Sequence, residues 1–257
     1  MFKKVIRWVL IALCIILIGY EAYSLYADNK EYDKARDEYA DIKSSSITSP
    51  ALEDASEIVE YPLLSIDYDY LKQVNPDFAG WLFVPALDIS YPVVKENIVD
   101  EYLRVTFDGT PNKAGCLFTD VLSSDDFTGW HDMIFGHNMR DESMFGKLKY
   151  LKTREYQEKL RENPYIYIYT PEYVYQYEAF GYYVTTVGSD AYSEVTNEEE
   201  YDEFLEYIRK NSYYSFPEDV DFSTYNSLLT LSTCSGSSGS GKRFVLHSVK
   251  RKAWNNL

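Results

Sequence analysis

The stretch from Ser227 to Val249 constrains the fold most strongly, because it predicts two neighbouring strands joined by a loop of small residues. Its first half, Leu228 to Thr233, is rich in strand-forming residues and runs into Cys234. A Ser/Gly loop follows, which supplies the residues that tight turns need, and a second strand runs from Arg243 to Val249. This arrangement brings a thiol and a guanidinium to one edge of a sheet, which suits acyl-transfer chemistry.

The same loop has two other interpretations. Residues 236–242 spell GSSGSGK, which matches the beginning of a phosphate-binding P-loop. The next position should be Ser or Thr to hold magnesium, but Arg243 stands there, and the residues after it predict a strand rather than the required helix. A nucleotide site is therefore excluded. Cys234 could also be an inert core residue, although such a residue has no need of a polar loop that ends in a cation.

Composition narrows the function further. The chain has 257 residues and a formal net charge of −16, which argues against a nucleic-acid partner because phosphates attract Lys and Arg. The cysteines are Cys14, Cys116 and Cys234, and Cys116 is expected to be a core residue at the start of a strand. No C-x-x-C pair or His/Cys cluster has zinc-ligand spacing, so the sequence predicts neither a metal nor another cofactor.

The N-terminal region predicts a membrane anchor. Basic residues precede an apolar run, and Val5 to Tyr26 is long enough to cross a bilayer, which needs about 20 residues. The alternative is a cleaved signal peptide, with Ala22 and Ser24 as small residues near the cleavage site. The helical continuation and the aromatic residues at both ends favour a retained anchor. The basic cluster predicts a single-pass protein in the cell membrane with a cytoplasmic N-terminus and an extracellular bulk.

We divide the chain into three parts. Residues 1–27 are interpreted as a cytoplasmic tip and membrane anchor, residues 28–56 as a stalk and linker, and residues 57–257 as the globular domain. Within the stalk, Asp28 to Ile42 has helical character, whereas Lys43 to Pro50 has the composition of a linker. The globular domain is expected to begin near Glu57.

The globular part predicts many short strands with a few inserted helices, a pattern typical of a closed or nearly closed β-barrel. Helices are expected over three segments: Asp67–Val74 with Asp67 as a possible N-cap, Thr153–Glu162, and the amphipathic Glu198–Lys210. Besides the two strands around Cys234, strands are expected over Gly80–Pro85, Ile89–Val94, Gly115–Thr119, Met133–Phe135, Tyr165–Tyr169 and Tyr173–Val187.

A nucleophilic cysteine needs a base or cation nearby, because the thiolate is the reactive form. His137 ends a strand at a Gly-His-Asn turn, where a scaffold displays a side chain. His131 lies in a predicted polar loop and could be a surface residue, and His247 lies in the last strand as either a core or a cleft residue. Position in the sequence alone favours His137 as the partner of the cysteine and does not exclude His131 or His247.

Three motifs together resemble the sortases, the membrane-anchored cysteine transpeptidases of Gram-positive bacteria. They are TLSTC at Thr230 to Cys234, the downstream Arg243, and FGHNMRDESMFGKLKYL at Phe135 to Leu151. The sequence motifs GHNMRD and MFGKLK and the segment NPDFAGWL at Asn75 to Leu82 resemble class B sortases in particular. The resemblance covers residues 60–252. It implies a mainly β fold, a closed barrel of about eight strands with inserted helices and an N-terminal helical segment.

The resemblance also implies roles. Cys234 would attack the threonine carbonyl of a C-terminal sorting motif, His137 would transfer protons, and Arg243 would stabilise the oxyanion. Ser232 and Thr233 are candidate substrate-binding residues, with a packing role for Ser232 equally open. The implied partners are secreted proteins with a C-terminal sorting signal and an amine of a peptidoglycan precursor or a pilin. The alternatives are an inert membrane-tethered binding module and a cysteine hydrolase.

The sequence departs from the class B pattern at two places. Class B members often carry an Asp-Asn pair shortly before Tyr-Leu, whereas this chain has Glu96-Asn97 and a longer spacing to Tyr102-Leu103. An acidic residue shortly after the cysteine is also absent, since Ser235 follows Cys234 directly. The third catalytic role therefore falls to Arg243. The segment from Tyr182 to Asn211 is expected to contribute most to the choice of substrate.

Overall fold

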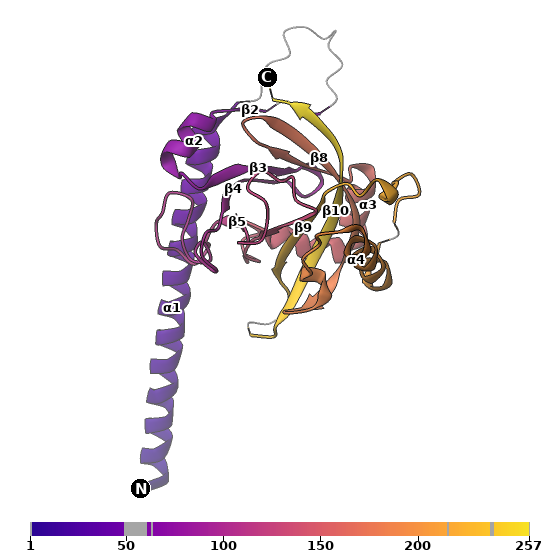
Figure 1. The fold of residues 1–257 in the computed structure, drawn as a ribbon. Helices are drawn as coiled ribbons and strands as arrows, with labels where there is room; N and C mark the ends of the chain where they lie inside the picture. The colour runs from indigo at the N-terminus through magenta and orange to yellow at the C-terminus, as the bar shows by residue number, and fades with distance from the viewer. Residues whose placement is uncertain (1, 49–60, 63, 215, 237–238, 257) are drawn as a thin grey trace.

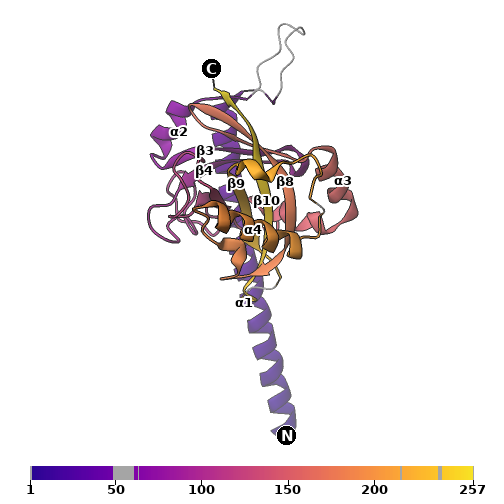
Figure 2. The same cartoon turned by 45° about the vertical axis from the view of Figure 1, so that its right-hand side comes forward.

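The structure is a computed structural model that describes residues 2–48, 61–62, 64–214, 216–236 and 239–256. A long N-terminal helix lies against one side of a closed β-barrel and projects well beyond it, as Figures 1 and 2 show from two directions. Shorter helices lie on the outside of the barrel (Figure 2).

The barrel has the closed strand order β10-β8-β7-β3-β4-β5-β6-β9. Neighbouring strands are antiparallel except for the parallel pairs β4–β5 and β6–β9. The closed eight-stranded barrel predicted from the sequence is thus confirmed. The strands are β3 (Phe78–Val84), β4 (Ile89–Lys95), β5 (Leu117–Thr119), β6 (His131–Phe135), β7 (Tyr165–Tyr169), β8 (Tyr173–Thr186), β9 (Leu228–Cys234) and β10 (Lys242–Asn255).

The three short helices lie close to the segments in which the sequence predicts them. Asp67 precedes α2 and accepts a hydrogen bond from the Tyr70 backbone N–H at 2.9 Å, which satisfies one free donor of the first turn. Asn197 caps α4 in the same way, and the buried side chains of α4 pack against β8 and β10 in a second apolar cluster. The helices are α2 (Tyr68–Val74), α3 (Arg154–Glu162) and α4 (Glu198–Asn211). Short 3₁₀ turns are η1 (Pro85–Leu87), η2 (Gly146–Lys152), η3 (Asp190–Tyr192) and η4 (Phe222–Thr224).

Helix α1 is continuous from Phe2 to Ser46. Its N-terminal part is exposed and apolar, and it is long and apolar enough to cross a membrane. Its C-terminal part buries Ala35, Tyr39 and Ile42 against the barrel, so tertiary packing continues the helix into the Ser-rich segment.

Residues 43–48 therefore differ from the linker predicted over Lys43 to Pro50, whose last two residues lie outside the described residues. Residues 43–46 are helical, and β1 (Ile47–Thr48) pairs with β2 (Ser65–Ile66). The expected domain start near Glu57 lies outside the described residues.

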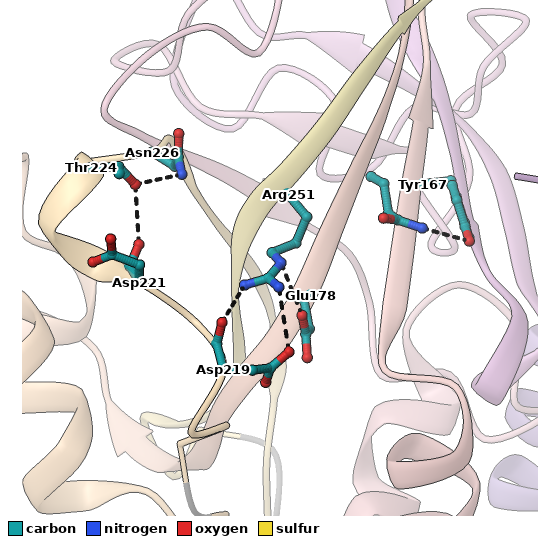
Figure 3. Close-up of polar contacts among 8 residues, drawn as sticks. Tyr167, Glu178, Asp219, Asp221, Thr224, Asn226 and Arg251 are labelled. Atoms are coloured by element: carbon teal, nitrogen blue, oxygen red, sulfur yellow. Dashed lines mark hydrogen bonds and ion pairs between the residues drawn. The ribbon is translucent and has the colours of Figure 1, made fainter. Parts of the chain in front are cut away.

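An ion-pair cluster fixes the connection that leads into β9 (Figure 3). Arg251 on β10 contacts the carboxylate of Glu178 on β8 at 3.2 Å and that of Asp219 at 3.5 Å. Glu178 is 7% exposed, and burial raises the pKa of its carboxyl group. Farther along, Asn226 donates to the Thr224 hydroxyl at 2.8 Å just before β9 begins. The connection that precedes the strand carrying Cys234 is thus attached to β10 through Arg251.

Candidate active site

All five residues predicted for the site line one pocket of about 480 Å³ on the barrel wall: His137, Ser232, Thr233, Cys234 and Arg243. Cys234 is the exposed last residue of β9, whereas the strand before it is buried. Arg243 is its direct antiparallel partner on β10. Side chains of directly opposed residues have Cβ atoms about 4.5–5.5 Å apart. The hairpin therefore brings the thiol and the guanidinium together.

His137 reaches the same pocket because the turn after β6 is hydrogen-bonded to β9 residue by residue. The Gly136 N–H donates to the Ser232 carbonyl at 3.1 Å, and the Thr233 hydroxyl donates to the Gly136 carbonyl at 2.7 Å. The Asn138 side-chain amide then donates to the Cys234 carbonyl at 2.9 Å. These contacts lie on both sides of His137, so its backbone is fixed relative to that of Cys234.

The imidazole of His137 has a defined tautomer in this arrangement. Its Nε2 lies 2.6 Å from the Leu103 carbonyl oxygen, which can only accept a hydrogen bond. Nε2 therefore carries a proton, and Nδ1 is the nitrogen left for proton exchange with a reacting group.

Arg243 is half-buried as a residue, and Nη1 of its guanidinium donates to the Lys242 carbonyl at 3.1 Å. Tyr192 lies close to both Arg243 and Cys234. Burial is the main cause that raises the pKa of the Tyr192 phenol, and the nearby Arg243 charge opposes that rise. The remaining donors of the guanidinium can turn toward a substrate oxygen in the pocket.

The two candidate substrate-binding residues differ in their partners. Ser232 is almost fully buried, and its hydroxyl is hydrogen-bonded to the Tyr192 hydroxyl at 2.9 Å. The Thr233 hydroxyl donates its hydrogen bond to the Gly136 carbonyl, so Thr233 helps to orient the turn that carries His137. Both line the pocket, and a contact of either with substrate stays a prediction.

The expectation that His131 could be a surface residue is wrong. It is the first residue of β6, is 8% exposed, and its Nε2 is 2.7 Å from the Thr230 hydroxyl. Thr230 in turn is 2.7 Å from Nδ1 of His247, which is 1% exposed and bonded through Nε2 to the Tyr183 hydroxyl at 3.0 Å. His247 is thus a core residue. Both imidazoles bond to Thr230 and neither lines the pocket that Cys234 faces. The pairing of β6 with β9 explains why the segment that looked like a polar loop is buried.

These two imidazoles predict a loss of stability in acid. Burial lowers the pKa of His131 to about 4 and that of His247 well below its ordinary value. Between pH 4 and 6.5 the unfolded chain therefore binds more protons than the folded one, so the free energy of unfolding falls as pH falls. For His131 alone the expected loss is about 2 kcal/mol between pH 7 and 5. Urea unfolding of the full chain in detergent at pH 7, 6 and 5 measures it.

The variant His131→Gln is the control, because an amide retains a donor and an acceptor without titrating. It should show a flatter dependence of unfolding free energy on pH between 7 and 5. An equally steep dependence in this variant would show that other groups, such as the buried imidazole of His247, control the acid response.

Several groups at the site were not predicted from the sequence. The Leu103 carbonyl and the Tyr192 hydroxyl gave no sequence signal of their own, although Tyr192 lies in the segment expected to affect substrate choice. Asn138 was visible only as the third residue of Gly-His-Asn. Asn97 directs its amide to the Asp77 carboxylate at 3.2 Å, and Glu96 lines the pocket, where burial raises its pKa.

Cys116 is a buried core residue, as predicted, and it lies immediately before β5. It is 1% exposed, and burial raises the pKa of its thiol to about 12, which leaves it unreactive at neutral pH.

Comparison with known proteins agrees with this geometry. The family model described as "Sortase domain" matches residues 82–251. Sortase B of Listeria monocytogenes is 29% identical over 167 residues, which span 64% of this chain and 65% of that protein. Sortase B of Staphylococcus aureus is 26% identical over 244 residues, which span 93% of this chain and 92% of that protein.

Solved structures agree in fold as well. Sortase B from Bacillus anthracis in complex with AAEK1 has a TM-score of 0.68 and 25% identity, covering 86% of this chain and 99% of that one. The Staphylococcus aureus sortase B–substrate complex has a TM-score of 0.63 and 25% identity, covering 72% and 84%. The matched family model spans most of the barrel, and the chain therefore belongs to the sortase family of cysteine transpeptidases, with class B sortases among its relatives.

Proposed function

We propose that this protein is a membrane-anchored transpeptidase that cleaves a C-terminal sorting motif after Thr and transfers the acyl group to an amine. The observation that carries the proposal is the convergence of Cys234, His137 and Arg243 on one pocket from three separate strand ends. Similar proteins have been solved with a substrate and with triglycine, which supports a peptide and an amine as the two reactants.

The first half of the reaction forms a thioester. The Cys234 thiolate attacks the threonine carbonyl carbon, and the carbonyl oxygen becomes an oxyanion that the Arg243 guanidinium stabilises with charge-assisted hydrogen bonds. Collapse of this intermediate breaks the peptide C–N bond. His137, as imidazolium, gives its Nδ1 proton to the departing amine, while its Nε2–H stays on the Leu103 carbonyl.

The second half transfers the acyl group. An incoming amine loses a proton to the now neutral Nδ1 of His137, attacks the thioester carbonyl, and expels the Cys234 thiolate. Three carboxylates also line the pocket, those of Glu96, Asp100 and Asp120, and they favour a cationic amine over a neutral acceptor. The amine of a peptidoglycan precursor or of a pilin fits this requirement.

The apolar lining of the pocket and the N-terminal helix fit the same proposal. Apolar side chains of Val99, Leu103, Leu122 and Val187 line the pocket together with the polar catalytic groups, which suits an extended peptide rather than a small polar molecule. Helix α1 would hold this site beside the membrane, with the N-terminus in the cytoplasm and the barrel outside the cell.

A peptide-library cleavage assay tests the proposed function. The full-length protein in detergent is mixed with peptides of varied sequence, with and without triglycine or lysine peptides. We expect cleavage after Thr in a restricted set of peptides and a new amide product when an amine is present. Cleavage that ignores added amines would indicate a hydrolase, and binding without cleavage would indicate an inert module.

A further inference from the structure

The C-terminal half of α1 is attached to the loop that follows Leu103. The Glu31 carboxylate accepts a hydrogen bond from the Lys113 backbone N–H at 2.7 Å, and the Glu38 carboxylate accepts one from that of Asp108 at 3.1 Å. These bonds hold the loop along nearly two turns of the helix. The loop therefore takes its shape from α1 as well as from the barrel.

Tyr39 makes the deepest of these contacts. It is 5% exposed, and its hydroxyl donates to the Gly115 carbonyl at 2.7 Å while accepting from the Phe107 N–H at 3.3 Å. Its ring packs edge-on against Tyr91 with centroids 5.5 Å apart. The hydroxyl thus joins the two ends of the loop to one point on α1.

Gly115 lies directly against the carbonyl groups of Tyr102 and Leu103. A Cβ atom at position 115 would come 2.7 Å from the Leu103 oxygen and 2.9 Å from the Tyr102 oxygen. The next residue, Cys116, donates its N–H to the Tyr102 carbonyl at 3.2 Å. The backbone at 115–116 therefore sets the direction of the Leu103 carbonyl, which is the hydrogen-bond acceptor of His137.

We propose that α1 positions the catalytic histidine, through Tyr39, the Gly115 backbone and the Leu103 carbonyl. The inference rests on the proposed role of His137 in proton transfer. When the path is intact, Nε2 stays on Leu103 and Nδ1 faces the reacting amine. When it is disturbed, the imidazole loses its fixed tautomer, so the chemical step slows while the peptide pocket is kept. The C-terminal half of α1 is in this way a positioning element of the active site.

The substitution Gly115→Ala tests the path, and Gly109→Ala is its matched control. Both glycines lie in the same loop with positive φ, +59° and +87°, so both substitutions strain the backbone. Only position 115 has close neighbours, because no described atom lies within 4 Å of a Cβ at position 109. We expect Gly115→Ala to lower kcat about tenfold or more with KM nearly unchanged, and Gly109→Ala to leave kcat within about twofold.

A second variant and a second measurement separate positioning from folding. Tyr39→Phe keeps the buried ring and removes only the hydroxyl, and we expect kcat to fall about threefold to tenfold. Nitrogen NMR of the labelled full-length protein, recorded at a pH where the imidazole is neutral, should show His137 as the Nε2–H tautomer in the wild type and Gly109→Ala, and a tautomer mixture in Gly115→Ala. This spectrum tests the path even if no peptide is cleaved, which is the outcome that would refute the proposed function instead. Gly115→Ala and Tyr39→Phe proteins with wild-type kcat and an unchanged His137 tautomer would overturn the inference.

Discussion

Replacing Cys234 by alanine is expected to lower kcat for peptide cleavage by at least about 10⁴-fold, because no other thiol among the described residues lines the pocket and could form the acyl intermediate. The side chain is exposed at the end of β9, so its removal leaves no cavity in the core. The thermal midpoint of the variant should therefore equal that of the wild type. Steady-state cleavage of the peptide selected from the library, together with a melting curve, measures both.

The control for this variant is Cys14→Ala. Cys14 is a second exposed cysteine, but it lies in α1, outside the pocket. Its replacement should leave cleavage at the wild-type rate. If Cys234→Ala retained substantial cleavage while Cys14→Ala lost it, the nucleophile would have been assigned to the wrong thiol.

Replacing Arg243 by lysine is expected to lower kcat/KM on the order of 10² or more. Lysine keeps the positive charge but loses the planar pair of donors that can bind one oxygen from two directions. Because Arg243 is paired with Cys234 across the hairpin, a shorter point charge cannot reach the oxyanion with the same geometry. Full kinetics for cleavage and amide formation should show both steps slowed, since each passes through an oxyanion.

Lys242→Met provides the comparison for charge alone. Lys242 is the exposed neighbour of Arg243, and its side chain does not line the pocket. Removing its charge should change kcat/KM by no more than about twofold. Wild-type turnover in Arg243→Lys would refute the proposed role of the guanidinium, whereas a large loss in Lys242→Met would show that positive charge outside the pocket also affects the reaction.

Local sequence patterns predicted the parts of the fold whose causes are local. The hairpin around Cys234 follows from strand formers on both sides of a Ser/Gly turn, and α2 follows from its Asp67 cap. The turn that presents His137 was visible because Gly-His-Asn interrupts an apolar run. These features depend on neighbours within a few residues, so the sequence alone carries them.

Features that depend on distant contacts were not predictable in the same way. His131 looked like a loop residue because its neighbours are polar, and only the parallel pairing of β6 with β9 shows why it is buried. The segment 43–46 had the composition of a linker, but burial of Ile42 on the barrel continues the helix. The acceptor at Leu103 is a backbone carbonyl, and a pattern of side chains does not predict which backbone carbonyl will accept a hydrogen bond from a histidine.

Intact-protein mass spectrometry tests the central claim most directly. The full-length protein is mixed with the peptide that it cleaves, quenched in acid within seconds, and weighed with and without triglycine. The proposed chemistry predicts a mass increase equal to the acyl part of the peptide, located on Cys234, that disappears when triglycine is present as the peptide–triglycine product forms. Cleavage without any adduct on Cys234, or an adduct that persists when the amine is added, would contradict it.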